Sequence, residues 1–298
     1  MPLPLLSLTT TALSMYLTIF AVELVLLYPL FAWVKWQLMV QVGMSRQERQ
    51  IVFSNRTRRF DLDYLIARYG DRRLRTIDGL SRKLLHIVAG FWQLAVLNFI
   101  VKDTEVALIA TFLYQIFILM LSSISYSSNK VFGLAWLMYG ASSRIRDGIY
   151  GRKNLFAARC SFLSLIPLAI IDQVARQNVS DPTDLVLFSF FVFLPLTIGD
   201  ALGELIGSTW GKQKLRVWGI GQINRKSLLG TLAVFLGSLV PLLLVTYGYR
   251  LSLSWYALAL GISTLTTGTE LVAPRGTDNF FIPVNNATLC LGFVFFFL

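Results

Sequence analysis

Charged residues and cysteine are both scarce in this chain of 298 residues. Lys, Arg, Asp and Glu together make up 14% of the sequence, whereas hydrophobic residues make up 55%, and the mean hydropathy is +0.62. These values lie far from those of a soluble globular domain, so the composition predicts a membrane protein. The only two cysteines are Cys160 and Cys290. Two thiols exclude a disulfide framework and a thiolate metal cage.

Two signatures of soluble or secreted proteins are also missing from the sequence. Gly211-Lys212 is followed by Gln213 and has no glycine five residues before it, which excludes the usual phosphate-binding loop of soluble nucleotide hydrolases. No basic stretch precedes the first apolar run, so we expect an uncleaved membrane anchor rather than a cleavable signal. We find no internal repeat and expect no separate extramembrane domain.

Eight apolar runs approach the length that a helix needs to cross a bilayer, about 20 residues. They predict an all-α fold, a polytopic integral membrane helical bundle of about eight transmembrane helices. An N-terminal anchor with a basic loop is expected at 1–79 and a membrane-embedded domain at 80–298. The run at 131–140 is too short to cross unaided, so it is expected to be interfacial or re-entrant. The predicted spans are residues 10–34, 84–101, 105–126, 160–171, 185–199, 227–247, 252–268 and 282–298.

The positive charge lies mostly on one predicted side of the membrane. The segment Lys35–Lys83 contains 12 Lys and Arg against 5 Asp and Glu, and loops rich in Lys and Arg stay in the cytoplasm. Following the spans from there, residues 143–159, 200–226 and 269–281 also fall inside and both termini fall outside. The net charge of +11 would therefore face anionic lipid headgroups or an anionic nucleotide, and we expect no nucleic-acid partner.

Glycine recurs every fourth residue between positions 199 and 211, with a polar residue directly after each one. On an α-helix a four-residue repeat keeps its members on one face, so the glycines form a bare groove. Each glycine costs a helix about 1 kcal/mol relative to alanine, which implies close approach of another body. That body is either a neighbouring transmembrane helix or a metal and phosphate group, which the adjacent carboxylates favour. The two stripes are Gly199, Gly203, Gly207 and Gly211, and Asp200, Glu204, Ser208 and Lys212.

The single histidine of the chain lies in a basic cluster at the start of a predicted span. A helix places Arg82, Lys83 and His86 on one face, because His86 follows the two cations by four and three residues. Asp78 and Ser81 are expected to cap that helix. The two cations could simply mark the membrane interface. A histidine inside an apolar run is suited to act as a general base or a phosphate partner.

Two breaks between apolar runs carry further polar residues. Polar backbone at membrane depth requires protein or a water-filled cavity around it. Glu270, Asp278 and Asn279 offer hard oxygen ligands suited to magnesium, although Asp and Asn are also ordinary turn residues. At the start of the run at 227–247, a second group could hold a phosphate through backbone N–H groups and charge, or could be routine flanking charge. This group comprises Arg225, Lys226, Ser227, Gly230 and Thr231.

Four motifs therefore follow one another along the chain. They are Arg82-Lys83-x-x-His86, Gly199-Asp200-x-x-Gly203-x-x-x-Gly207-x-x-Trp210-Gly211-Lys212, Lys226-Ser227-x-x-Gly230-Thr231, and Glu270 with Asp278-Asn279-x-x-x-Pro283. In this order they resemble the CTP-dependent polyprenol and lipid kinases, which include dolichol, phytol and farnesol kinases and a CTP-dependent diacylglycerol kinase. The resemblance covers about residues 80–290. The chain departs from it at Leu229, where many members carry an acid, and at Gly203 and Trp210, where alanine and phenylalanine are frequent.

The resemblance implies transfer of the terminal phosphate of CTP to a membrane-embedded lipid alcohol, with Mg²⁺, giving a lipid monophosphate and CDP. Residues 80–298 would then be the catalytic kinase domain, with its active site on the cytoplasmic side. Phosphoryl transfer needs mainly positioning and charge neutralisation, so catalytic roles are expected for Arg82, Lys83, His86 and Asp200. Nucleotide contacts are expected at Gly199, Gly203, Gly207, Gly211, Lys212, Arg225, Lys226, Ser227 and Gly230, and Mg²⁺ ligands at Asp200, Glu204, Glu270, Asp278 and Asn279.

Three other functions stay open at this point. A phosphatidate cytidylyltransferase-like enzyme would also use CTP in a membrane but would release pyrophosphate, and its acid-rich signature is not seen here. A transporter would carry intramembrane acids and broken helices as well, together with internal pseudo-repeats. A non-catalytic helical protein could use the glycines for assembly alone. For a kinase, the short chain before residue 80 favours an acceptor of the phytol or farnesol type over dolichol.

Overall fold

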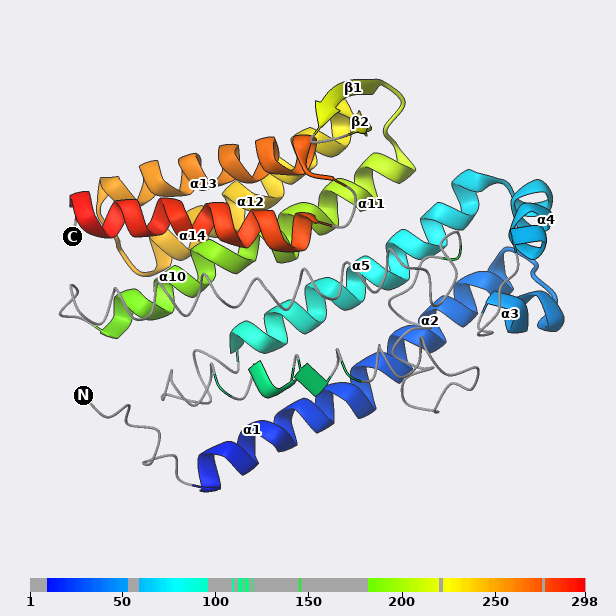
Figure 1. Ribbon diagram of the computed structural model, residues 1–298, viewed down its shortest axis with the longest axis horizontal. Helices are drawn as coiled ribbons and strands as arrows, with labels where there is room; N and C mark the ends of the chain where they lie inside the picture. The colour runs from blue at the N-terminus through cyan, green and yellow to red at the C-terminus, as the bar shows by residue number, and fades with distance from the viewer. Residues whose placement is uncertain are drawn as a thin grey trace.

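The computed structural model describes residues 10–52, 59–95, 182–219, 222–274 and 277–297, with a few isolated residues between 109 and 145. Long helices make up most of this part of the chain (Figure 1). The elements, in order, are α1 (Thr10–Val22), the π-helical segment η1 (Glu23–Leu27), α2 (Tyr28–Gln41), α3 (Arg46–Val52), α4 (Arg59–Tyr69), α5 (Asp71–Ala95), α10 (Pro182–Leu194), the π-helical segment η4 (Pro195–Asp200), α11 (Ala201–Thr209), β1 (Lys214–Gly219), β2 (Gln222–Ser227), α12 (Leu228–Gly248), α13 (Leu253–Val272) and α14 (Asp278–Phe297).

Four helices in the described ranges are long and apolar enough to cross a membrane. They agree with four of the predicted spans, so the chain is a helical membrane protein. The predicted spans 84–101 and 252–268 fall on α5 and α13, which are not among these four. The count of eight stays a prediction, because 160–171, the run at 131–140 and most of 105–126 lie outside the described residues. The four are Leu17–Gln41, Val186–Thr209, Leu228–Gly248 and Asp278–Phe297.

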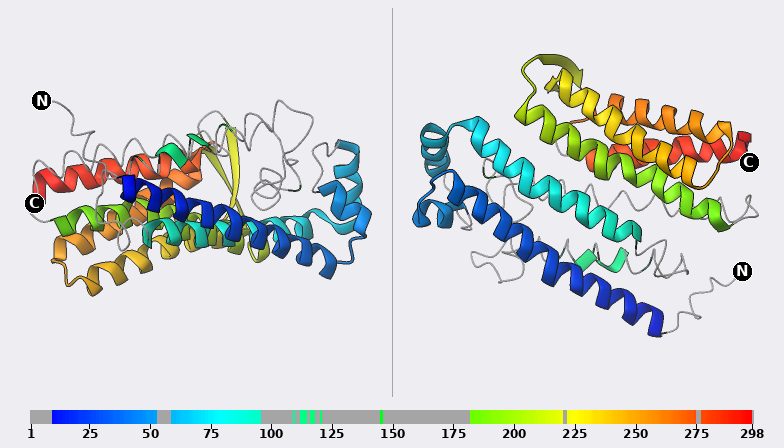
Figure 2. Two further views of the ribbon diagram at one scale, coloured as in Figure 1. Left: turned by 90° about the horizontal axis from the view of Figure 1, so that it is seen from below. Right: turned by 180° about the vertical axis from the view of Figure 1, so that it is seen from behind.

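Helix α5 lies between two groups of helices, with α2 on one side and α11 on the other (Figures 1 and 2). Beyond α11, helices α10, α12, α13 and α14 share a core around Trp255, whose ring lies 5.4 Å from that of Phe188 and 4.9 Å from that of Phe293. On the other side, α5 shares a second core with α2, α3 and α4, in which Met39 and Leu65 are fully buried. The two faces of α5 therefore connect the two halves of the described fold.

Two π-helical segments interrupt the long helices, and each contains a buried carboxylate. Glu23 begins η1 and Asp200 ends η4. In a π-helix each N–H donates to the carbonyl five residues earlier, so a turn holds one residue more than an α-helical turn. Pro195 explains the break at η4, because it has no N–H to continue the α-helical pattern. The segment η4 thus sets the direction in which Asp200 points.

A β-hairpin departs from the predicted all-α fold. Strands β1 and β2 pair antiparallel between α11 and α12, with Lys214 opposite Ser227 and Gly219 opposite Gln222. Alternate side chains of β1 are exposed, and Trp218 is 85% exposed. Helix α12 begins directly after this hairpin, so the hairpin fixes the entry into the helix.

The polar stretch before the second predicted span is more ordered than the sequence suggests. It forms α3, α4 and the first half of α5, and α5 runs without a break through position 80. The expectation that Asp78 and Ser81 cap a helix is wrong, because both residues are buried in the middle of α5. The Ser81 hydroxyl donates to the Ile77 carbonyl instead, at 3.0 Å.

Candidate functional site

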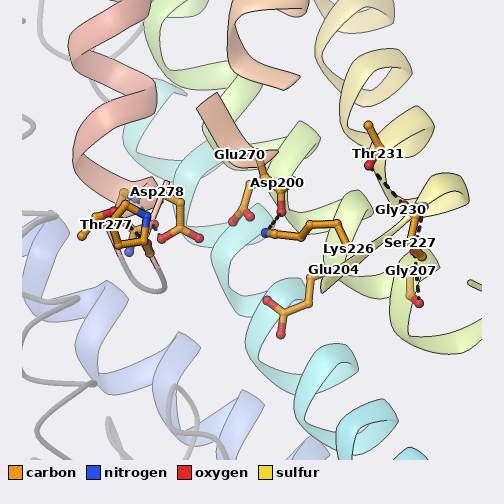
Figure 3. A network of polar contacts seen from close by, with 12 residues as sticks. Asp200, Glu204, Gly207, Lys226, Ser227, Gly230, Thr231, Glu270, Thr277 and Asp278 are labelled. Carbon is orange, nitrogen blue, oxygen red and sulfur yellow. Dashed lines mark hydrogen bonds and ion pairs between the residues drawn. The ribbon is translucent and has the colours of Figure 1, made fainter. Parts of the chain in front are cut away.

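Charged side chains from five separate stretches of chain gather in one partly buried cluster. Figure 3 shows its four carboxylates and Lys226. Helix α5 supplies two cations, η4 and α11 supply two carboxylates, and the junction of β2 and α12 supplies a third cation. The end of α13 and the start of α14 add one carboxylate each. This central cluster consists of Arg82, Lys83, Asp200, Glu204, Lys226, Glu270 and Asp278.

Helix α5 meets η4 and α11 through ion pairs. Lys83 pairs with Asp200 and Arg82 pairs with Glu204. The Lys83 ammonium also lies 3.3 Å from the Glu204 carboxylate. Adjacent residues on α5 can reach both acids because Asp200 and Glu204 are one helical turn apart. Lys83 is only 2% exposed and Asp200 only 3%, so each charge depends on its partner for stabilisation.

Another ion pair joins the end of β2 to the end of α13. Lys226 reaches the carboxylate of Glu270, which also interacts electrostatically with Asp200 and Asp278. Figure 3 shows these three carboxylates near one another, with Lys226 extended toward them. Asp278 accepts a hydrogen bond from the Asn279 N–H at 3.1 Å. Within the described ranges, no lysine or arginine lies within 4.0 Å of the Asp278 carboxylate.

His86 lies on α5 one turn beyond the two cations and borders the cluster. Its imidazole interacts electrostatically with Lys83, Asp200 and Glu204. The side chain is half-buried. The structure therefore brings the single histidine together with Asp200, although the two residues are 114 positions apart in the sequence.

One donor in the cluster has no partner. The Nε of Arg82 is buried and makes no hydrogen bond, although its terminal nitrogen donates to Glu204. A buried N–H without an acceptor costs about 1–3 kcal/mol. An anion that accepted this hydrogen bond would recover that cost.

The glycine stripe packs mainly against helix α12. A Cβ at Gly199 would lie 3.1 Å from the Val234 carbonyl and collide with Ser238, and a Cβ at Gly203 would collide with the Val234 side chain. The close body expected at these two positions is therefore a neighbouring helix, the alternative that the sequence left open. Nucleotide contact stays a prediction for all of the glycines, and Gly207, Gly211 and Gly230 lie near the α12 N-terminus.

Ser227 is the N-cap of α12. Its hydroxyl oxygen accepts the Gly230 N–H at 3.0 Å, and the hydroxyl donates to the Gly207 carbonyl at 3.4 Å. This arrangement holds the end of α11 against the start of α12, beside Lys226. Lys212 is exposed in the turn before β1. The backbone of Arg225 pairs with Arg216 in the hairpin, whereas its side chain lies outside the described residues.

The carboxylates suit a hard divalent cation by ligand type and charge. In the described part of the chain, however, no three Asp, Glu, His or Cys residues stand close enough to form a ready metal cage. Three of the carboxylates are instead paired with lysine or arginine. Bound Mg²⁺ would have to take the place of those cations, and the role of Asn279 as a ligand stays a prediction.

The sequence reasoning missed Lys35. It was assigned to the cytoplasmic loop, but it lies within the spanning helix Leu17–Gln41 and is 1% exposed. Its ammonium lies 3.3 Å from the carboxylate of Asp78 on α5. A lysine at the edge of an apolar run was the available signal, because charged residues inside the membrane usually have a function.

Comparison with known proteins gives one similarity to a curated protein. No protein-family model matches the chain, and no solved structure matches it. The chain is 29% identical over 104 residues to a phytol kinase of Synechocystis sp.. The match covers 35% of this chain and 43% of that protein, so less than half of the relative's length is spanned. Over about a third of its length, this helical membrane protein is therefore similar to a phytol kinase.

Proposed function

We propose that the protein transfers the terminal phosphate of CTP to a membrane-embedded lipid alcohol of the phytol or polyprenol type, with Mg²⁺, at the cytoplasmic side of the membrane. The observation that carries the proposal is the convergence of three cations and four carboxylates from distant stretches of chain in one partly buried cluster. The partial similarity to a phytol kinase supports it independently.

The ion pairs of the central cluster favour a ligand that carries both signs of charge. A bare polyanion entering this site would meet four carboxylates, and a bare cation would meet Arg82, Lys83 and Lys226. A magnesium nucleotide supplies phosphates for the cations and a cation for the carboxylates. Because each displaced charge finds a new partner, the exchange avoids the cost of an unpaired buried ion.

The residues of the site then have different roles in the reaction. Arg82, Lys83 and Lys226 hold the phosphate oxygens, and Asp200, with Glu270 or Asp278, would hold Mg²⁺. His86 accepts the proton of the lipid hydroxyl. A bond forms between that hydroxyl oxygen and the terminal phosphorus, while the bond from this phosphorus to the bridging oxygen breaks and releases CDP. Mg²⁺, when bound, neutralises charge that develops on the phosphate oxygens.

The direct test follows the terminal phosphate of CTP. Purified protein in detergent or nanodiscs is incubated with CTP labelled at the terminal phosphorus and with phytol, farnesol, dolichol or diacylglycerol. We expect the label on a lipid monophosphate, less product with ATP, GTP or UTP, and none without Mg²⁺. Label in pyrophosphate together with a CDP-lipid would instead identify a cytidylyltransferase.

A variant connects this activity to the cluster. Asp200→Asn removes one carboxylate charge while Glu204 still lies 3.3 Å from Lys83, so the protein is expected to fold. Turnover should fall by about 100-fold or more, as for the loss of a charge-stabilising group in other active sites. Arg75→Met is the matched control, because Arg75 forms an exposed pair with Asp71 on the same helix α5. Unchanged turnover in Asp200→Asn would rule out this site.

A further inference from the structure

The strongest feature outside the central cluster is the buried ion pair between the first spanning helix and α5. The side chains of Lys35 and Asp78 are 1% and 7% exposed. Both carboxylate oxygens of Asp78 also accept the backbone N–H of Ile145, at 3.0 and 2.9 Å. The Asp78 carboxylate therefore has an ion-pair partner on α2 and a hydrogen-bond donor at Ile145, and neither partner belongs to α5.

Asp78 has a second potential partner on its own helix. Arg82 lies four residues later on α5, which is the spacing at which an acid and a base pair along a helix. Arg82 and Asp78 interact electrostatically, but the guanidinium donates to Glu204 on α11 instead. Arg82 thus lies between two carboxylates, one facing α2 and the other in the central cluster.

We propose that Lys35 is a positioning residue, which neutralises Asp78 and so keeps Arg82 directed toward Glu204 and the site. Without the Lys35 ammonium, Asp78 would be a buried carboxylate short of a cation, and the nearest arginine on its own helix would turn to it. The first spanning helix would then belong to the functional unit rather than serve only as an anchor. The activity part of this inference rests on the proposed function.

The first test compares one single variant with one double variant. In Lys35→Met, Arg82 should turn to Asp78, and the KM for CTP should rise about tenfold or more, with a smaller change in kcat, because a charge-assisted hydrogen bond to phosphate is lost. In Lys35→Met with Asp78→Asn, position 78 no longer carries a carboxylate that draws Arg82 away from Glu204, so the KM should return to near the wild-type value. Arg75→Met again serves as the control.

If the Lys35–Asp78 pair has only a structural role, the double variant should not recover the wild-type KM. If Lys35 and Asp78 only join two helices, the double variant lacks the same link and should be impaired as much as the single variant. That outcome would overturn the inference. Lys35→Gln gives the same comparison if Lys35→Met does not fold, because glutamine keeps a hydrogen-bond donor for Asp78 while removing the charge.

The second test does not depend on activity. A double-mutant cycle of Arg82→Met and Glu204→Gln measures the coupling between these side chains by thermal unfolding in detergent. We expect coupling in the wild type, none in the Lys35→Met background, and recovery with Lys35→Met and Asp78→Asn together. Coupling that follows this pattern in a protein without CTP turnover would reject the proposed function alone. Coupling that persists in Lys35→Met would reject the positioning role.

Discussion

At the scale of single residues, burial decides how much each charge matters. The Arg75–Asp71 pair is 48% and 39% exposed, and such surface pairs contribute at most about 1 kcal/mol. Lys83 and Asp200 form a similar pair that is almost fully buried, where loss of one partner costs about 3–5 kcal/mol. The buried pairs are thus the positions at which substitutions will have large effects.

His86 is expected to act as the proton acceptor of the proposed reaction. His86→Ala should lower kcat by about 100-fold or more, because general base catalysis contributes about that factor. The KM for CTP should change less, since the imidazole borders the cations and forms no ion pair with a carboxylate of the described ranges. The measurement is the steady-state rate with saturating CTP and lipid alcohol. A full rate in His86→Ala would remove the residue from the mechanism.

Glu48 gives a prediction for stability against pH. Burial alone raises its pKa, but hydrogen bonds from the Ser45 N–H and from the Tyr69, Ser45 and Tyr64 hydroxyls outweigh this effect and lower the pKa from 4.5 to about 2. A carboxyl group with a lowered folded-state pKa stabilises the fold above its unfolded pKa. This contribution should be complete above about pH 5 and disappear as the pH falls from 4.5 to about 2.

The measurement compares the wild type with Glu48→Gln by thermal unfolding in detergent across that pH range. The wild type should be more stable at pH 6, and the difference should shrink toward zero near pH 2. Subtraction cancels the titration of other carboxyl groups. A difference that stays constant with pH would show that Glu48 is not held ionised by these hydrogen bonds.

Residue types could be predicted from the sequence better than their partners. The sequence identified the acids and bases of the central cluster, because charges beside apolar runs are rare enough to stand out. It could not assign Asp78, which looked like a helix cap but pairs with Lys35 across two helices. The spacing of residues along a helix predicts which side chains are neighbours on that helix. It does not predict contacts between helices, because these depend on how the helices pack.

At the scale of elements, the glycine stripe predicts a contrast between two substitutions. Gly203→Ala should destabilise the protein by about 1–3 kcal/mol, because the new Cβ collides with Val234 on α12. Gly268→Ala, in α13, meets nothing within 4 Å and should be neutral or stabilise by up to about 1 kcal/mol. Thermal unfolding of both variants in one detergent is the check. Equal changes in stability for the two variants would mean that α11 does not pack against α12 at Gly203.

The helices were easier to predict than the hairpin. Long apolar runs identify α12 and α14 to within a few residues, because the hydrophobic length of a span is set by the bilayer. Strands β1 and β2 lie in a short polar segment, for which the predicted all-α fold contains no strand. The alternation of Leu215 and Val217 with charged residues, followed by Gly219, was the available strand signal.

At the scale of the whole molecule, the charge distribution predicts which ends face the cytoplasm. Trp218 in the hairpin and Leu253 at the start of α13 are 85% and 83% exposed and lie near opposite ends of α12. In a cell or an oriented vesicle, Trp218→Cys should react with a membrane-impermeant maleimide only from the cytoplasmic side. Leu253→Cys should react only from the other side. The reverse pattern would invert the proposed location of the site.

The extra residue in segment η4 has a consequence for how related chains could diverge. A π-helical turn absorbs one additional residue, so the helices on its two sides keep almost the same facing. The regular helix α11 has no such allowance, and deleting one residue between Asp200 and Glu204 would turn everything after the deletion by about 100° relative to Asp200. Glu204 would then leave Arg82 while the span kept its apolar character. A single codon therefore separates this chain from a descendant that still inserts into the bilayer but has lost one ion pair of the central cluster.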